Sequence, residues 1–313
     1  PRPIEANMQP DVIVIGAGPN GLAAAARLAK AGRKVLILER GNQAGGLSAK
    51  REFHPGYSVP GILHDDALTT KRAANQLDLE KHGLNFRTAP ATYIAEQDGP
   101  GLLLSADTST TAAAIAQRSR HDGDNYSLYR SFLTRIQPVF EKILSEDPPP
   151  LTPNGWKEVL GLARRGLVAL KLKRKEMIEL ARVAPMCVAD FLNEKFETPF
   201  LVEALAAPAV ASTWSGPWSA GSNTNLLLRE CTGGECIAGG PAALVAALAA
   251  AAKVNGAELR LNCEVARLRL TSGGEVAGVT LASGETIDAP ITTPSSAVLA
   301  THTGGMVSES RPE

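Results

Sequence analysis

The sequence has few aromatic residues, no excess of charge of either sign and no long apolar run. Phe, Trp and Tyr make up only 4% of the 313 residues, which argues against a surface on which nucleic-acid bases stack. Its 32 basic and 32 acidic residues cancel, so bulk charge does not favour nucleic-acid binding either. No apolar stretch approaches the roughly 20 residues of a membrane span, and residues 1–10 are unlike a secretory signal. Membrane-spanning and nucleic-acid-binding classes are therefore not expected.

Cysteine is scarce as well. Four cysteines in so long a chain do not form a disulfide framework, so we expect a reducing, intracellular environment. The cytoplasm is the expected location, and an organelle is the alternative. The sequence contains no C-x-x-C pair and its five histidines are scattered, so no metal site is expected.

Residues 11–39 predict a strand, a glycine-rich turn, a helix and a second strand. DVIVI at 11–15 is a continuous apolar run, typical of a strand buried on both faces of a parallel sheet. The turn GAGPNG follows, then a helix that stops at Gly32, and then KVLIL at 34–38. This order within about 30 residues indicates a βαβ unit.

The turn itself matches a dinucleotide-binding pattern. Gly16 permits a tight turn, Gly18 lets the backbone approach a pyrophosphate, and Gly21 allows close packing of helix on strand. The N-terminus of the helix offers free N–H groups and a positive dipole to phosphates. Glu39, at the end of the second strand, has the right type and spacing to accept hydrogen bonds from a ribose, which favours FAD or NAD over NADP. A plain glycine turn is the alternative.

A second glycine pair follows at Gly45 and Gly46. A loop that passes close to an extended dinucleotide needs glycine, because the missing Cβ removes a steric barrier. A flexible loop is the alternative.

The middle of the chain has a different pattern. Residues 92–104 predict a hairpin, Asp107 is suited to cap a helix, and 124–146 reads as an amphipathic helix that Pro138 should kink. From 239 the α/β pattern returns, with an Ala-rich helix and then a strand and an antiparallel meander over 258–288.

Several segments resemble one family of flavoproteins. VIGAGPNGLAAAARLAKAGRKVLILERGNQAGGLSA resembles the N-terminal FAD fingerprint of the phytoene-desaturase and amine-oxidase group. HDGDNYSLYRSFLTRIQPVFEKIL, ADFLNEKFETPFLVEALAAPAV and GGPAALVAALAAAAKVNGAELRLNCEVARLRLTSGGEVAGVTLASGETIDA resemble its phytoene dehydrogenase-related branch, so that the likeness covers roughly residues 10–290.

The resemblance implies an α/β fold. We expect an FAD/NAD(P)-binding Rossmann-like domain with a β-meander, formed by 1–75 and 220–295, and a mainly helical substrate domain with a small sheet at 76–219. Residues 296–313 are expected to be an irregular tail. The chain is expected to lack the family's C-terminal segment.

The resemblance also implies the cofactor site. The glycine turn would hold the pyrophosphate of FAD, Glu39 the ribose, and the backbone of Val265 the adenine. The expected site residues are Gly16, Ala17, Gly18, Pro19, Asn20, Gly21, Glu39, Arg40, Gly45, Gly46, Leu47 and Val265. No catalytic residue is assigned, because the segment GYSVPGILHDD departs from the family's pattern.

The expected function is FAD-dependent oxidoreduction of desaturase, dehydrogenase or oxidase type. A small organic substrate, whether a polyene, a retinoid-like lipid or an amine, would transfer hydride to the flavin. One alternative is an NAD-linked dehydrogenase, which would need neither the second glycine pair nor the strand at Val265. The other is a non-catalytic protein of the same fold that acts in binding or assembly.

Three further features have two interpretations each. Cys231 and Cys236 have the C-x-x-x-x-C spacing of dithiol flavoenzymes, but two semi-buried thiols are the alternative. His64 beside Asp65 could be an acid–base pair or a surface histidine. The basic stretch 157–182 suits either peripheral contact with a membrane or a solvated helix face.

Overall fold

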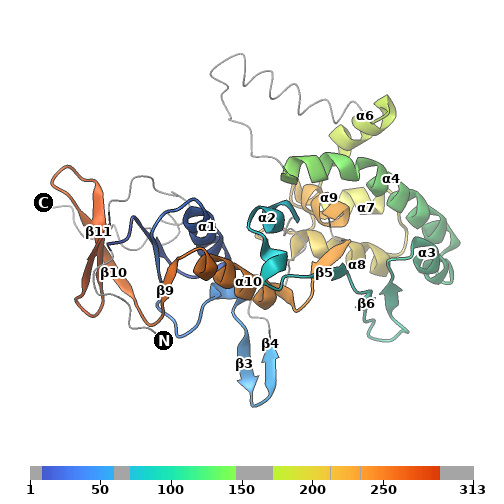
Figure 1. Ribbon diagram of the computed structural model, residues 1–313. Coiled ribbons are helices and arrows are strands. Elements are labelled where there is room, and N and C mark those ends of the chain that lie inside the picture. The colour runs from blue at the N-terminus through green and yellow to red at the C-terminus, as the bar shows by residue number, and fades with distance from the viewer. Residues whose placement is uncertain (1–8, 60–70, 146–171, 212, 233, 290–313) are drawn as a thin grey trace, which may run out of the picture. The chain divides into compact units, whose positions relative to one another are not determined.

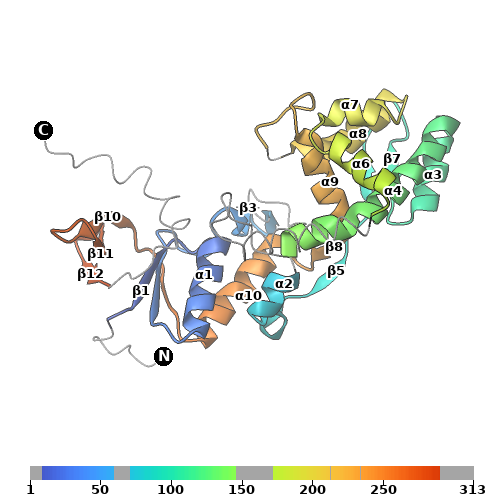
Figure 2. The same cartoon turned by 90° about the horizontal axis from the view of Figure 1, so that it is seen from above.

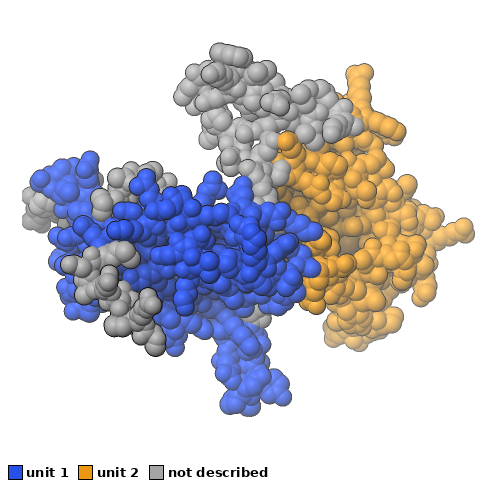
Figure 3. All heavy atoms as spheres, in the orientation of Figure 1, with its two compact units in different colours: residues 1–86, 237–313 blue, residues 87–236 orange. Residues whose placement is uncertain are grey.

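The computed structural model describes residues 9–59, 71–145, 172–211, 213–232 and 234–289. They form two compact units (Figure 1). Unit 1 contains the described residues up to Phe86 and those from Ile237 onward, and unit 2 is Arg87–Cys236; Figure 3 gives each its own colour.

A three-stranded parallel sheet lies at the centre of unit 1. Its order is β1 (Val12–Ile15), β2 (Val35–Leu38) and β9 (Glu258–Arg260). The expected strands at 11–15 and 34–38 are confirmed, and β2 is buried along its whole length. Because parallel strands end at the same edge, Ile15, Leu38 and Arg260 mark one edge of the sheet.

The two faces of this sheet are covered differently (Figures 1 and 2). On one face, α1 (Pro19–Lys30) and α10 (Gly240–Val254) pack together against Val14 and Ile37. On the other face, a three-stranded antiparallel sheet of β10 (Val265–Leu270), β11 (Val276–Leu281) and β12 (Thr286–Asp288) covers alternate residues of β1 and β2. The helix, strand and meander expected from residue 239 onward are confirmed, and each large aliphatic side chain buried between the layers contributes roughly 1.5–3 kcal/mol.

Short elements complete unit 1 and join it to unit 2. The hairpin β3 (Arg51–His54) and β4 (Tyr57–Val59) follows the 3₁₀ turn η1 (Gly46–Ser48). The helix α2 (Lys71–Gln76) precedes the 3₁₀ turn η2 (Leu79–His82). Where the chain passes between the units, β5 (Phe86–Thr88) pairs with β8 (Glu235–Ile237).

In its described residues, unit 2 is mainly helical and contains a small hairpin, as expected. β6 (Thr92–Ile94) and β7 (Leu102–Leu104) form the expected hairpin. The carboxylate of Asp107 accepts hydrogen bonds from the backbone N–H groups of Ser109 and Thr110, which confirms the expected cap. The helices described in this unit are α3 (Thr108–Ala116), α4 (Arg120–Ser145), α6 (Arg174–Val183), α7 (Val188–Asn193), α8 (Pro199–Val210) and α9 (Ser222–Thr232).

The expected helix at 124–146 is α4, which begins four residues earlier and continues through Pro138 to Ser145. Within the described ranges, no helix combines the length and the apolar character needed to cross a bilayer.

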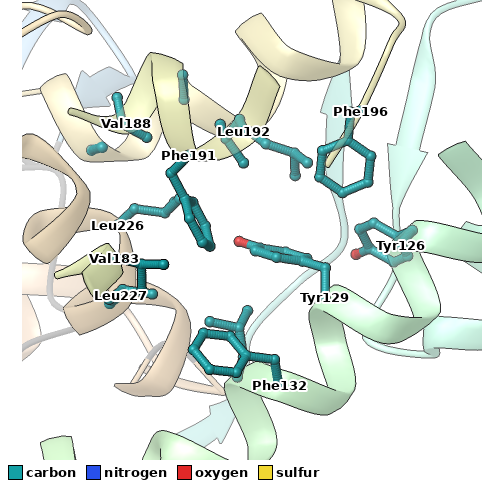
Figure 4. Close-up of a cluster of buried hydrophobic side chains, with 14 of the residues drawn as sticks. Tyr126, Tyr129, Phe132, Val183, Val188, Phe191, Leu192, Phe196, Leu226 and Leu227 are labelled. Carbon is teal, nitrogen blue, oxygen red and sulfur yellow. The ribbon is translucent and has the colours of Figure 1, made fainter. Parts of the chain in front are cut away.

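The core of unit 2 forms around Tyr129 of α4 (Figure 4). Its ring lies 6.3 Å from that of Phe191 and 5.8 Å from that of Phe196, the latter edge to face. Leu226 and Leu227 of α9 belong to the same cluster. Burial raises the pKa of the Tyr129 phenol well above its ordinary value, so the side chain stays neutral.

The unit boundaries differ from those expected at 75 and 220. Leu79 and Leu84 pack into the core of unit 1, which moves the first boundary to Phe86. α9 packs its leucines and Cys231 into the core of unit 2, which moves the second boundary to Ile237. The expected tail at 296–313 lies outside the described residues.

A buried carboxylate joins two helices of unit 2. Asp122, near the start of α4, accepts backbone hydrogen bonds from Glu197 at 2.8 Å and Thr198 at 2.9 Å, immediately before α8. Burial raises the pKa of the Asp122 carboxyl, but the bonds from Thr198, Glu197 and His121 outweigh burial and hold that pKa below its ordinary value.

The substitution Asp122→Asn should therefore destabilise unit 2. The amide keeps one acceptor oxygen, so one buried N–H loses its partner, and the free energy of unfolding at pH 7 should fall by about 1–3 kcal/mol. Because the folded-state pKa is depressed, the wild-type advantage is complete above the unfolded-state pKa and declines as pH falls through the folded-state pKa. Urea unfolding at pH 7 and at about pH 3 measures this difference.

The exposed Asp124, one half-turn along α4, provides the control substitution Asp124→Asn. Equal losses in the two variants, or a loss that does not shrink at low pH, would contradict this role for Asp122.

Candidate functional site

Three glycines shape the turn between β1 and α1, for different reasons. Gly16 has φ +94°, a conformation that favours glycine, and its N–H donates to the Leu38 carbonyl at 2.8 Å. A Cβ on Gly21 would lie 2.2 Å from the Gly16 carbonyl oxygen, so close packing of α1 requires glycine there. A Cβ on Gly18 would meet no protein atom within 4 Å. The fold itself thus requires glycine at positions 16 and 21, while the missing Cβ of Gly18 leaves space for a ligand.

The backbone N–H groups of this turn are only partly used. The Ala17 N–H donates to Glu39 Oε2 at 2.8 Å, and Pro19, the first residue of α1, has no N–H. The N–H groups of Gly18, Asn20 and Gly21 have no partner in the described part of the chain. They lie at the positive end of the α1 dipole, which suits them to bind an anion.

Glu39 lies directly after β2, at the edge where the parallel strands end. Its second carboxylate oxygen accepts the Gly41 N–H at 2.8 Å, so two backbone donors fix the group in place. Its own N–H donates to the Arg260 carbonyl, and its carbonyl accepts the Cys263 N–H. A carboxylate has about four acceptor positions, so Glu39 can still accept hydrogen bonds from the hydroxyls of a ribose.

The second glycine pair folds back onto the first turn. The Gly45 N–H donates to the Ala17 carbonyl at 2.8 Å. Gly45 has φ +129°, and a Cβ there would lie 2.8 Å from the Cα of Ala49. A Cβ on Gly46 would lie 3.4 Å from the Cα of Gly18. The hydrogen bond to Ala17 thus holds Gly45 and Gly46 in a defined conformation, which disfavours the alternative of a flexible loop.

These segments surround a cavity of about 590 Å³ at the carboxyl ends of β1 and β2. Ligands of open parallel sheets bind at this edge. Of the expected site residues, those that line the cavity are Gly16, Gly18, Glu39, Arg40, Gly46, Leu47 and Val265. The remaining ones build the adjoining turns and helix start: Ala17, Pro19, Asn20, Gly21 and Gly45.

Other lining residues were not expected from the sequence: Ile15, Leu38, Gly41, Asn42, Gln43, Ala49, Arg51, Cys263 and Glu264. Ile15 and Leu38 could have been inferred as the last residues of the two expected strands. Cys263 and Glu264 immediately precede Val265, so their place beside the cavity could also have been inferred from the sequence. Arg51 carried no such signal, because its place depends on how the loop after Gly46 folds back.

The cysteine pair does not form a reactive dithiol. Cys231 lies in the core of unit 2, where its thiol donates to the Leu133 carbonyl at 3.8 Å. Burial raises the pKa of Cys231 to about 12, which disfavours the thiolate that redox chemistry requires. Cys236 is half-buried, and both are free thiols. The alternative of two semi-buried thiols is therefore the better description.

His64 and Asp65 lie outside the described residues.

Among the described residues, His121, Asp122 and Glu197 could in principle ligate a metal, since one ligand atom of each lies within 4.8 Å of the others. Both carboxylate oxygens of Asp122 are already engaged by the backbone before α8. This arrangement accounts for the cluster as a contact that holds the start of α4 to the residues before α8.

Comparison with known proteins gives a family match over most of the chain. A model described as "Flavin containing amine oxidoreductase" matches residues 20–307. The mouse pyridine nucleotide-disulfide oxidoreductase domain-containing protein 2 is 29% identical over 300 residues, which cover 88% of this chain and 51% of the mouse protein. The hydroxyneurosporene desaturase of Cereibacter sphaeroides is 26% identical over 301 residues, covering 90% of this chain and 54% of that protein. The chain thus spans about half the length of these relatives.

Solved structures share the fold. A Rab GDI from Plasmodium falciparum aligns with a TM-score of 0.54 at 12% identity, covering 90% of this chain and 64% of its own. A triple mutant of putrescine oxidase aligns with a TM-score of 0.53 at 16% identity, covering 90% of this chain and 56% of its own. At these identities the likeness shows the fold alone, an α/β architecture with a Rossmann-like domain.

The contrast between two glycines can be tested by substitution. Gly18→Ala should leave the free energy of unfolding almost unchanged, because φ −72° suits alanine and its Cβ meets no protein atom. It should weaken FAD binding by at least about tenfold, since the new methyl group occupies space that the diphosphate needs. Gly21→Ala should lower both stability and FAD binding. Urea unfolding and calorimetric FAD titration measure the two effects; a Gly18→Ala variant that binds FAD normally would contradict the site.

Proposed function

The chain belongs to the flavin-containing amine oxidoreductase family, and we propose that it acts as an FAD-dependent oxidoreductase of the desaturase, dehydrogenase or oxidase type. The observation that carries the proposal is the cavity over Gly18, where a Cβ would meet only open space and where Glu39 presents a fixed carboxylate. FAD is the cofactor of this family, and the residues that line the cavity fit it.

Each part of the cofactor has a matching surface in unit 1. The unpartnered N–H groups of Gly18, Asn20 and Gly21 suit the diphosphate. The carboxylate of Glu39 suits the hydroxyls of the adenosine ribose. The apolar side chains at the ends of β1 and β2, with Val265 opposite, suit the adenine. When bound, FAD supplies the hydride acceptor, and this chain's residues hold its dinucleotide part in place.

The substrate is a small organic molecule, and we propose that it is lipophilic. The relative named hydroxyneurosporene desaturase supports this class, since its name denotes a polyene. The family match favours flavin chemistry over an NAD-linked dehydrogenase. The likeness to a Rab GDI concerns the fold alone and does not favour a non-catalytic role.

The cofactor preference can be measured directly on the purified chain. FAD should raise the free energy of unfolding by about 2.7 kcal/mol when its free concentration is about 100 times its Kd, while NAD at the same concentration should have little effect. Thermal unfolding with each nucleotide measures the shift, and the visible absorption of the purified protein shows whether flavin is retained. The variant Glu39→Ala should lose most of the shift. A protein that neither retains flavin nor responds to FAD would contradict the proposed function.

We also propose that unit 2 contacts a lipid surface. The basic stretch 157–182 lies outside the described residues as far as 171, but α6 and the residue before it expose Lys173, Arg174 and Lys175. Ile178 of α6 is 58% exposed. Cations beside apolar side chains favour the interface of an anionic membrane. A cytoplasmic location is likewise a proposal, and the four free cysteine thiols suit it.

Two exposed tryptophans support the same contact. Trp214 is fully exposed and Trp218 is 68% exposed, on a loop between α8 and α9 that carries no charged residue. The Gly221 N–H donates to the Pro185 carbonyl at 2.9 Å, which ties this loop to the chain just after α6. Tryptophan favours the boundary between lipid and water, so this loop also suits contact with a membrane surface.

The double variant Trp214→Ser with Trp218→Ser should bind vesicles of mixed neutral and anionic lipid severalfold less than the wild type. Co-sedimentation with the vesicles measures the bound fraction, and Tyr93→Ser, at a 60% exposed aromatic of the same unit, is the control. Undiminished binding by the double variant, or an equal loss in the control, would contradict the contact.

A further inference from the structure

Two arginines line the cofactor cavity, and the glycine pattern of the dinucleotide-binding turn assigns a role to neither of them. Its charged lining residues are Glu39 and Glu264, which are acidic, and Arg40 and Arg51, which are basic. Glu39 is engaged by two backbone N–H groups. Neither arginine has a carboxylate partner in the described part of the chain. Some arginines elsewhere form ion pairs, for example Arg182, which contacts Glu179 and Glu194.

The glycine turn itself supplies no positive side chain. A diphosphate brings two negative charges, whereas the turn offers N–H dipoles only, and Pro19 removes one of these. The basic residues of α1, Arg27 and Lys30, lie in its last turn, and Lys30 is paired with Asp78. A compensating side-chain cation would therefore have to come from another segment that borders the cavity.

Arg51 belongs to the wall of the cavity whose loop contacts the first glycine turn. The loop from Gly45 to Ala49 lies against Ala17 and Gly18, through the Gly45 hydrogen bond and the close approach of Gly46. Arg51 follows Ala49 by two residues, at the start of β3, and both residues line the cavity. Arg40 instead follows Glu39 directly, at the ribose end. The loop therefore carries Arg51 along the wall that begins beside Gly18, whereas Arg40 belongs to the wall that begins at Glu39.

From this geometry we infer that Arg51 is the side-chain cation that binds the diphosphate of the cofactor. The inference rests on the proposed function and names a residue of that same site. The planar guanidinium can donate two parallel hydrogen bonds to one phosphate, which an ammonium group cannot do. Arg51 is thus a positioning residue for the dinucleotide, and its contribution depends on the phosphates rather than on the flavin.

The test separates phosphate recognition from recognition of the nucleoside. Calorimetry measures the binding of FAD, ADP and adenosine to the wild type and to Arg51→Met, Arg51→Lys, Arg40→Met and Lys50→Met. Lys50 is an exposed cation beside Arg51 that does not line the cavity, so its variant is the matched control. Arg51→Met should weaken ADP and FAD binding by about tenfold or more, while adenosine binding stays unchanged. Arg51→Lys should restore part of the loss.

Salt provides a second readout that a purely structural role would not change. ADP binding to the wild type should weaken as ionic strength rises, and Arg51→Met should weaken this dependence, because the charge pair is gone. Since Arg51 is exposed, urea unfolding of the variant should match that of the wild type.

The outcomes that overturn the inference are distinct. If Arg51→Met binds ADP as Lys50→Met does, Arg51 does not bind the diphosphate. If Arg40→Met alone shows the phosphate-specific loss, the cation is Arg40 and the assignment to Arg51 is wrong. If the wild type binds neither FAD nor ADP, the proposed function fails and the inference fails with it, whereas normal FAD binding with an unaffected Arg51 variant overturns the inference alone.

Discussion

The hydrogen bonds of Glu39 hold together the strand ends at which the cavity opens. Its carboxylate accepts hydrogen bonds from the N–H of Ala17, in the turn after β1, and from the N–H of Gly41, in the loop after β2. Its backbone binds Arg260 of β9 and Cys263, just before the meander. One residue thus connects four segments of unit 1. Because backbone N–H groups of the protein hold the carboxylate in place, binding of a nucleotide to it needs little further ordering of the backbone.

Unit 1 depends on contacts between distant parts of the chain. β2 pairs with β9, for example Leu36 with Glu258, and all of unit 2 lies between them in sequence. Closing so long a segment costs entropy, which the packing of α1 on α10 and the burial of both faces of the sheet must offset. Unit 2 instead forms its core around Tyr129 from neighbouring helices of one continuous segment.

The parts of the fold that follow local rules were predictable from sequence. The strand, glycine turn, helix and strand up to Glu39 follow from apolar runs and from glycine at fixed spacing, and the Asp107 cap and the meander follow from similar signals. The sequence did not predict that α9 belongs to unit 2, because this depends on which of the two cores Leu226 and Leu227 pack into. The place of Arg51 in the cavity likewise depends on a loop whose path is set by the Gly45 contact with Ala17. The spacing of apolar residues predicts which face of an element is buried, but it does not predict which other element that face packs against.

The pairing of β5 with β8 has a consequence for how unit 2 is inserted. The Ala238 N–H donates to the Asn85 carbonyl at 2.8 Å on the side of unit 1, and the Ala89 N–H donates to the Gly234 carbonyl at 3.2 Å on the side of unit 2. The two ends of unit 2 therefore leave unit 1 as neighbours. An insertion with adjacent ends can be exchanged for another of different length or shape without moving the strands it interrupts. The same unit 1 could in this way carry a different inserted unit.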